Sequence, residues 1–140
     1  MLSPLLRFGL VLLASCSALC AQSYNWTTFA GRPPQPGIVT GAARDARFFR
    51  PWGIVSTNIG LTFVSDSTAD CIYIILPDDT VTLLTGSTVR GGLDGPGREA
   101  RFAARAGLAF TNNYLFVADR YNHAIRRVSS TGETTTFAGR

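Results

Sequence analysis

Short apolar runs separated by polar turns dominate the chain from residue 53 onward. The runs are rich in β-branched and aromatic residues, a composition typical of strands. The intervening turns contain residues that tolerate positive φ, such as Gly60, Asn112 and Gly132, so neighbouring strands should run antiparallel. Eight strands are predicted in two sets, 53–56, 61–65, 71–76 and 80–85, then 107–110, 114–118, 124–129 and 133–138.

The run Cys71-Ile-Tyr-Ile-Ile-Leu76 is apolar at every position and does not alternate with polar residues. A strand of this kind is covered on both faces, which predicts a sheet stacked between two neighbours. Cys71 begins the run, and its sequence neighbours include no base that would lower its pKa. We therefore predict that Cys71 is a buried structural thiol.

The two sets of strands belong to a repeated unit. Ala46-Arg-Phe48 recurs 54 residues later as Ala100-Arg-Phe102, and Val64-Ser-Asp66 recurs 53 residues later as Val117-Ala-Asp119. The units extend over about 32–86 and 87–139. A further match, between Thr28-Phe-Ala-Gly31 and the end of the second unit, predicts a leading strand. Repeats of this size bury their apolar faces by stacking on their neighbours.

Each unit begins with a connection rich in glycine and proline, which excludes long helices there. Both connections end in a repeated segment of an acid, Ala, Arg and Phe, at residues 45–48 and 99–102. Either the segment forms one helical turn that places its phenylalanine between adjacent sheets, or it is a loop anchored by a buried aromatic ring. Both alternatives predict that Phe48 and Phe102 are buried.

The second unit resembles the NHL repeat family, and the first unit is a degenerate copy. The resemblance implies an all-β fold, a partial NHL-type β-propeller made of two four-stranded antiparallel blades plus the leading strand. Closed propellers have about 4 to 8 blades, so we expect that two units need further blades or self-association. The matching features are Asp94-Gly-Pro-Gly97, Ala100-Arg-Phe102, Gly107-Leu-Ala109, Leu115-Phe-Val-Ala-Asp119, Asn122, Ile125-Arg-Arg-Val128 and Phe137-Ala-Gly139.

Residues 1–21 have the features of a secretory signal peptide, and residues 22–140 would form the mature chain. Cleavage after Cys20 or Ala21 fits the small residues there, while Leu13-Ala-Ser-Cys16 resembles a lipobox and allows a lipid anchor at Cys16. The uncharged stretch 8–21 is too short for a membrane span. We expect a secreted or extracytoplasmic protein, in the periplasm or at the cell surface. Asn25 lies in a glycosylation sequon, which has meaning only in a eukaryotic source.

Charge argues against a nucleic-acid partner. The 13 basic residues, all arginine, exceed the 9 acidic residues by four, and they are scattered along the chain. A nucleic-acid surface would require a clustered basic stripe with interleaved aromatic residues. Arg126 and Arg127 form the largest local excess. Their side chains should point to opposite faces of a strand and pair with acids of a neighbouring blade.

Asp66 and Asp119 end equivalent strands, where a carboxylate can accept hydrogen bonds from the turn that follows. The alternative, implied by related lyase and lactonase propellers, is a ring of carboxylates around a divalent cation. His123 is the only histidine and lies in a turn, so we expect a surface residue. The sequence predicts no metal site and no cofactor.

The turn Arg120-Tyr-Asn-His123 is predicted to lie at one rim of the propeller, where these folds usually place binding residues. Arg120, Tyr121, Asn122 and His123 are therefore the candidate binding site, for a protein or glycan ligand. The sequence favours a non-catalytic binding or scaffold module. The alternative is part of a metal-dependent propeller lyase or lactonase.

Overall fold

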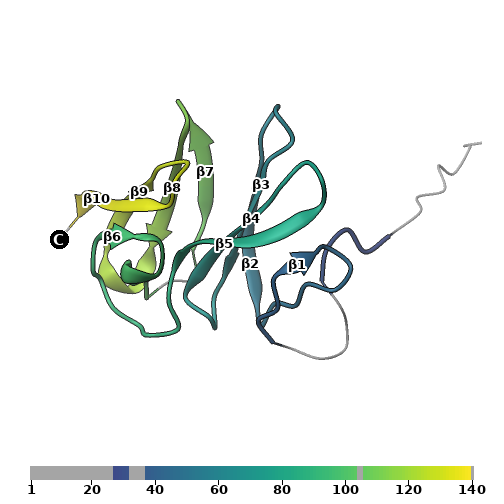
Figure 1. The fold of residues 1–140 in the computed structure, drawn as a ribbon. Helices are drawn as coiled ribbons and strands as arrows, with labels where there is room; N and C mark the ends of the chain where they lie inside the picture. Colours follow the sequence, from purple (N-terminus) through teal and green to yellow (C-terminus); the bar gives the residue numbers. More distant parts are fainter. Residues whose placement is uncertain (1–26, 32–36, 104–105, 140) are drawn as a thin grey trace, which may run out of the picture.

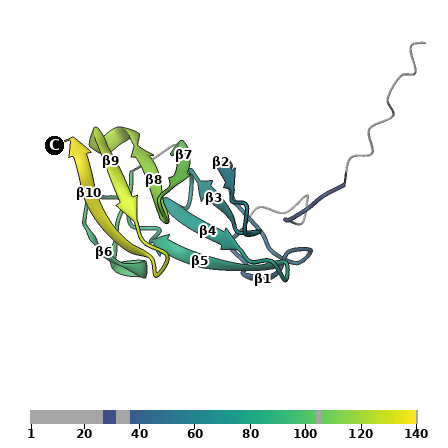
Figure 2. The same cartoon turned by 90° about the horizontal axis from the view of Figure 1, so that it is seen from above.

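The protein is described by a computed structural model that covers residues 27–31, 37–103 and 106–139. Two five-stranded antiparallel sheets stand side by side and are joined by the connection after residue 86 (Figures 1 and 2). The predicted signal peptide, the lipobox Cys16 and the sequon residue Asn25 lie outside the described residues.

The first sheet has the strand order β1-β5-β4-β3-β2, and the second has the order β6-β10-β9-β8-β7. The strands of the first sheet are β1 (Gly41–Ala42), β2 (Pro51–Ser56), β3 (Thr62–Asp66), β4 (Cys71–Ile75) and β5 (Thr80–Gly86). The second sheet contains β6 (Gly95–Pro96), β7 (Leu108–Thr111), β8 (Tyr114–Asp119), β9 (Ala124–Val128) and β10 (Glu133–Gly139). Two short 3₁₀ helices are η1 (Gly97–Glu99) and η2 (Arg120–Asn122).

The structure confirms the eight predicted strands, with ends shifted by one or two residues. The prediction of four strands per blade is wrong, because each sheet has a fifth strand of two residues at its edge. β1 pairs with β5, and β6 pairs with β10. These edge strands contain glycine and proline, residues that normally argue against a strand, and they form only because the connection passes beside an existing sheet.

The predicted leading strand at Thr28–Gly31 does not form. Its counterpart, Thr136–Gly139, lies in β10 and pairs with β9. Within the described part of the chain, no strand runs beside residues 28–31, although the Gly31 N–H donates to the Ala43 carbonyl at 3.0 Å. A strand needs a partner for its backbone groups, and here the sequence match alone was not sufficient.

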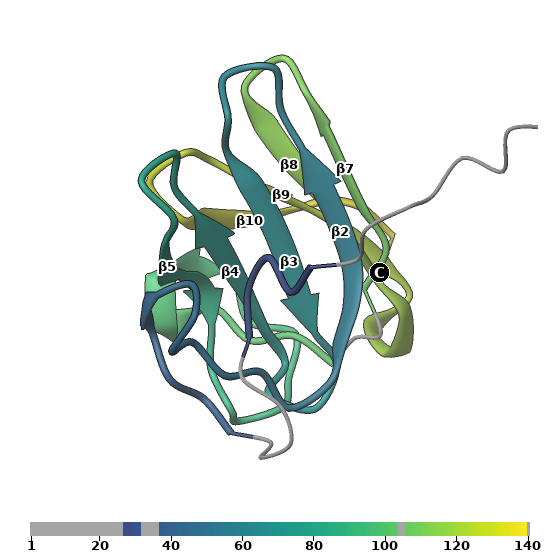
Figure 3. The same ribbon diagram turned by 90° about the vertical axis from the view of Figure 1, so that its right-hand side faces the viewer.

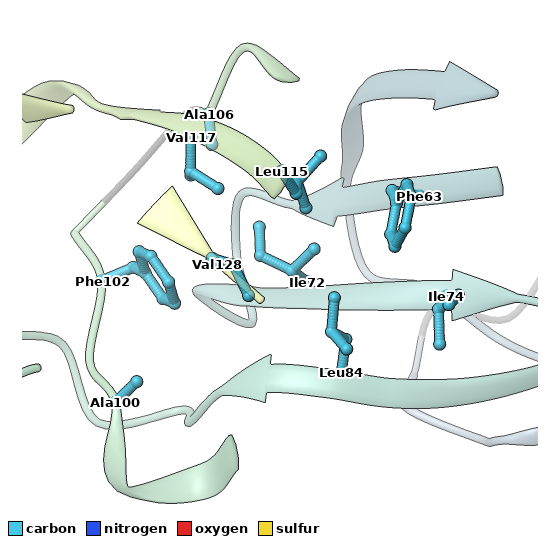
Figure 4. Close-up of a cluster of buried hydrophobic side chains, with 10 residues drawn as sticks. All are labelled: Phe63, Ile72, Ile74, Leu84, Ala100, Phe102, Ala106, Leu115, Val117 and Val128. Atoms are coloured by element: carbon cyan, nitrogen blue, oxygen red, sulfur yellow. The ribbon is translucent and has the colours of Figure 1, made fainter. Parts of the chain in front are cut away.

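The two sheets pack face to face around one apolar cluster. Phe63, Ile72 and Leu84 come from the first sheet, and Leu115 and Val128 come from the second. Figure 4 shows these side chains converging between the sheets. Alternate residues of each strand point to opposite faces, so one face of each sheet is used in this contact. The repeat therefore stacks, as predicted, and its two outermost faces lie on opposite sides of the molecule (Figure 3).

After their acidic first residues, which lie in a turn at Asp45 and in η1 at Glu99, the two segments are anchored loops and not helical turns. In the second unit η1 ends at Glu99, and Ala100 is extended with φ −61° and ψ 145°. Phe102 is 1% exposed and lies in the cluster between the sheets, which confirms its predicted burial. Phe48 is only half-buried, because it packs on the outer face of the first sheet, with its ring edge-on to Tyr73 at 5.4 Å.

Candidate functional site

The candidate rim turn follows directly from the end of β8. Asp119, the last residue of that strand, is completely buried. Its carboxylate accepts hydrogen bonds from the Ala103 N–H at 3.0 Å, the Asn122 side-chain amide at 2.8 Å and Arg126 at 2.9 Å. The turn is thus fixed to β9 and to the loop that carries Phe102.

Asp66 holds the equivalent position in the first sheet. It accepts from the N–H groups of Thr68 and Ala69 in the following turn, and from those of Phe49 and Arg50. The turn-capping prediction is confirmed for Asp66. For Asp119 the contact with the following turn is made by the side chain of Asn122 instead, because η2 places that amide beside the carboxylate.

A cation ring formed by these carboxylates finds no support in the geometry. Asp66 and Asp119 are each about 1% exposed or less and are occupied by the donors named above. Across residues 27–31, 37–103 and 106–139, no group of three or more His, Cys, Asp or Glu side chains is placed to hold a metal ion.

Arg126 and Arg127 point to opposite faces of β9, as strand alternation requires. The prediction that they pair with acids of a neighbouring blade is wrong for Arg126. Its guanidinium bonds to Asp119 and Asp94, both in its own unit. The loop before β6 runs across the end of the second sheet and brings Asp94 to this position, a contact that strand spacing alone does not indicate. Arg127 lies over the ring of Tyr114, with its guanidinium carbon 4.9 Å from the ring centroid.

Asp94 connects this network to β10. Partial burial of Asp94 disfavours its charged form, but hydrogen bonds from the Thr136 N–H and from Arg126 outweigh that effect and hold its pKa below the ordinary value. The ring of Phe102 lies 5.2 Å from the Arg126 guanidinium on the other side. Arg126 therefore ties together the Asp94 loop, the end of β8 and the core aromatic residue.

Of the four candidate rim residues, Arg120, Tyr121 and His123 are exposed and Asn122 is turned inward. The Asn122 amide donates to the Gly91 carbonyl at 2.7 Å as well as to Asp119. His123 follows η2 in the left-handed conformation, with φ 53°, and its N–H donates to the Arg120 carbonyl. Its predicted surface position is confirmed.

Tyr121 is 50% exposed and lies close to two arginines. The guanidinium carbons of Arg90 and Arg120 are 5.6 Å and 5.5 Å from its ring centroid. Arg90 also donates to Asp70 at 3.1 Å, while its side chain remains 59% exposed. Sequence reasoning missed Arg90, because it lies 30 residues upstream and reaches η2 only through the fold. Guanidinium groups bind carboxylate and phosphate in a fixed fork geometry, and an exposed aromatic ring adds a stacking surface.

Cys71 is buried, as predicted. Burial disfavours the thiolate and raises the pKa of Cys71 from 9.0 to about 11. A thiol with so high a pKa is a poor nucleophile at neutral pH. Cys71 is therefore a packing residue of the first sheet.

Comparison with solved structures identifies the class of fold. A Bacteroides thetaiotaomicron protein of unknown function aligns with 71% of this chain at 23% identity and a TM-score of 0.66, over 26% of its own length. An auxiliary nutrient binding protein from the same organism aligns with 69% at 21% identity and a TM-score of 0.56, again over 26% of its length. Virginiamycin B lyase from Staphylococcus aureus has 15% identity and a TM-score of 0.49, with 64% of this chain and 27% of that chain aligned.

The chain is an all-β, partial β-propeller, and it spans about a quarter of the length of these structures. No family model matches its sequence, and no curated protein matches it either. None of the residues described in the structure forms a helix long and apolar enough to cross a membrane.

Proposed function

We propose that this chain is a non-catalytic binding module of an extracytoplasmic β-propeller, and that it takes a protein or glycan ligand at the rim turn. The observation that carries the proposal is Tyr121, half-exposed and close to the guanidinium groups of both Arg90 and Arg120. Such an arrangement suits a ligand that offers acidic groups to the arginines and a flat or apolar face to the ring.

The hydrogen bonds of the rim turn narrow the set of residues that we expect to contact the ligand. Asn122 is committed to Gly91 and Asp119, so it positions the turn. Arg120, Tyr121 and His123 remain available to a ligand, and Arg90 extends the same surface. A buried network beneath an exposed turn favours recognition, because the turn is already ordered before the ligand arrives.

We also propose that the repeats are of the NHL type. The residues behind that resemblance include Asp94, Asp119, Asn122 and Arg126, and these four form one hydrogen-bonded network. A motif whose members support one another in a single blade has a physical reason to recur. The predicted signal peptide and a structural neighbour described as nutrient-binding support a location outside the cytoplasm and a binding role.

The test is a binding screen of the chain against acidic and neutral glycans and an acidic protein, followed by titration calorimetry. Tyr121→Ala and Arg120→Ala should each weaken binding by about tenfold or more, as expected for an aromatic or arginine anchor. Tyr114→Ala is the matched control, since Tyr114 is 39% exposed beside an arginine on another surface. Equal losses in Tyr121→Ala and Tyr114→Ala would contradict the assignment of the site.

A further inference from the structure

One face of the second sheet points away from the first sheet (Figure 2). Ile125 is 39% exposed and Phe137 is 58% exposed on this face, where Phe137 packs edge-on against Phe116. At the end of the sheet is a hollow of about 350 Å³, the outer pocket, whose lining includes Ala118, Ile125, Ala138 and Gly139 together with Arg120 and His123 of the rim turn. Large apolar side chains gathered around a hollow usually mark an interaction site.

The first sheet shows what such a pocket accommodates. The repeat relates Ile125 to Ile72 and Gly139 to Gly86, both at a spacing of 53 residues. In the first sheet Ile72 is only 2% exposed, because Phe102 of the next unit covers this end of the face. A Cβ atom added to Gly86 would stand 3.2 Å from the Phe102 ring. The position in the first sheet that corresponds to the outer pocket is therefore filled by Phe102, the phenylalanine of an Ala-Arg-Phe segment.

The two glycines show that the pockets have the same backbone shape. Gly86 has φ +98° and Gly139 has φ +95°, conformations that favour glycine. A Cβ atom on Gly86 would collide with the Asp70 carbonyl, and one on Gly139 would collide with the carbonyl of His123, the residue equivalent to Asp70. The outer pocket is thus the counterpart of a pocket that this chain already fills.

The chain also carries a second copy of the segment that fills the pocket. Residues 46–48, the Phe48 segment, are the counterpart of residues 100–102 and lie on the outer face of the first sheet. Asp66 holds the residue after Phe48 through its N–H at 2.6 Å, just as Asp119 holds the residue after Phe102. Both sides of one interface therefore occur on opposite surfaces of the same molecule.

We propose that copies of this chain associate head to tail, with the Phe48 segment of one copy against the outer pocket of the next. The contact is heterologous, so it can continue from copy to copy and form a ring or a filament. It differs from the internal interface in one respect. There Ser65 donates to Ala106 at 2.8 Å and Thr85 bonds to Thr134 at 2.7 Å, whereas their counterparts in the outer pocket are Ala118 and Ala138. The contact between copies therefore lacks these two hydrogen bonds.

Sedimentation velocity of the chain over a range of concentrations tests the proposal. The unmodified chain should form species larger than a monomer. Ile125→Arg, which places a charge in the outer pocket, and Phe48→Ala should each weaken association by about tenfold or more. Phe49→Ala is the control, because Phe49 is 42% exposed beside the Phe48 segment and should leave association unchanged. Circular dichroism establishes that each variant is folded.

A mixing experiment separates this contact from any symmetric dimer. Phe48→Ala keeps its pocket and Ile125→Arg keeps its segment, so the two variants should be monomers alone and form a 1:1 dimer when mixed. A chain that stays monomeric at all concentrations would overturn the proposal. So would folded variants that associate like the unmodified chain, or a mixture that gives no dimer. Should Phe48→Ala unfold because its contact with Tyr73 is lost, Ile125→Arg alone decides, since its side chain is at the surface.

Discussion

Replacement of Arg126 by methionine is expected to be the most damaging single charge removal in the second sheet. Arg126 is 1% exposed, and it neutralises Asp119, which has no exposed surface. Arg126→Met keeps most of the side-chain volume but leaves the Asp119 carboxylate buried without a cation. Removal of one partner from a buried ion pair typically costs about 3–5 kcal/mol. Single domains are stable by about 5–15 kcal/mol, so the loss is a large fraction of the total.

Two further variants isolate the cause. Asp119→Asn, added to Arg126→Met, removes the unpaired charge and should recover part of the lost stability, because the Asn side chain can still accept from the Ala103 N–H. Arg127→Met is the matched control on the other face of β9. Arg127 makes a partly exposed contact with the Tyr114 ring, a type of interaction worth about 0.5–1 kcal/mol.

Urea unfolding followed by circular dichroism measures the unmodified chain, these three variants and Asp119→Asn alone. We expect Arg126→Met to lower the free energy of unfolding several times more than Arg127→Met. The reasoning is refuted if the two single variants lose the same stability, or if Asp119→Asn adds its full cost on top of Arg126→Met.

Three other predictions concern the core, the Cys71 thiol and the dependence of stability on acidic pH. Phe102→Ala should lower the free energy of unfolding by about 3–5 kcal/mol, because it leaves a cavity between the sheets. Phe29→Ala, at a 55% exposed position, should change it by less than about 0.5 kcal/mol. Similar losses for the two variants in urea unfolding would contradict this prediction. Burial raises the pKa of Cys71 to about 11, so native protein at pH 8 should react with iodoacetamide far more slowly than unfolded protein. For the same reason the free energy of unfolding should fall as the pH rises from about 9 towards 11. Rapid labelling of the native protein would disprove the burial argument. Hydrogen bonds hold the pKa of Asp94 below its ordinary value, so its contribution to stability is present above that ordinary value and is lost as the pH falls through the lowered pKa. Asp94→Asn should flatten this acid dependence, and an unchanged pH profile would count against the network.

The strands could be predicted from the sequence because strand propensity and turn chemistry depend on neighbouring residues. The uninterrupted apolar run of β4 predicts a strand covered on both faces, and all five of its residues are buried. The turn residues Asn112 and Asn113 both adopt positive φ, at 50° and 63°. Repetition added the stacking of two units, since Phe102 could be recognised as the counterpart of Phe48 without any coordinates.

The contacts between segments far apart in the chain could not be predicted from the sequence. The edge strands β1 and β6 consist of glycine, alanine and proline, and they pair only because the connection passes along β5 or β10. Arg126 was expected to seek an acid in another blade, but the Asp94 loop, 32 residues upstream, supplies one in the same unit. Spacing along a strand says which face a side chain occupies, and it does not say which loop crosses that face.

The candidate site divides in the same way. The sequence placed Arg120, Tyr121, Asn122 and His123 together in one polar turn, because these residues are adjacent in the chain. The tertiary structure separated Asn122 from the other three by turning its amide towards Asp119, and it added Arg90 beside the Tyr121 ring.

For this protein, the sequence by itself determined the strands, the repeat and the all-β class, because backbone propensity, turn chemistry and periodicity act over a few residues. Only the tertiary structure decided how the second unit holds its charges, which turn residues face outward, and why equivalent phenylalanines differ in burial. Phe102 meets a second sheet and Phe48 lies on an outer face. Burial is a property of what packs against a residue, and that partner is far away in the chain.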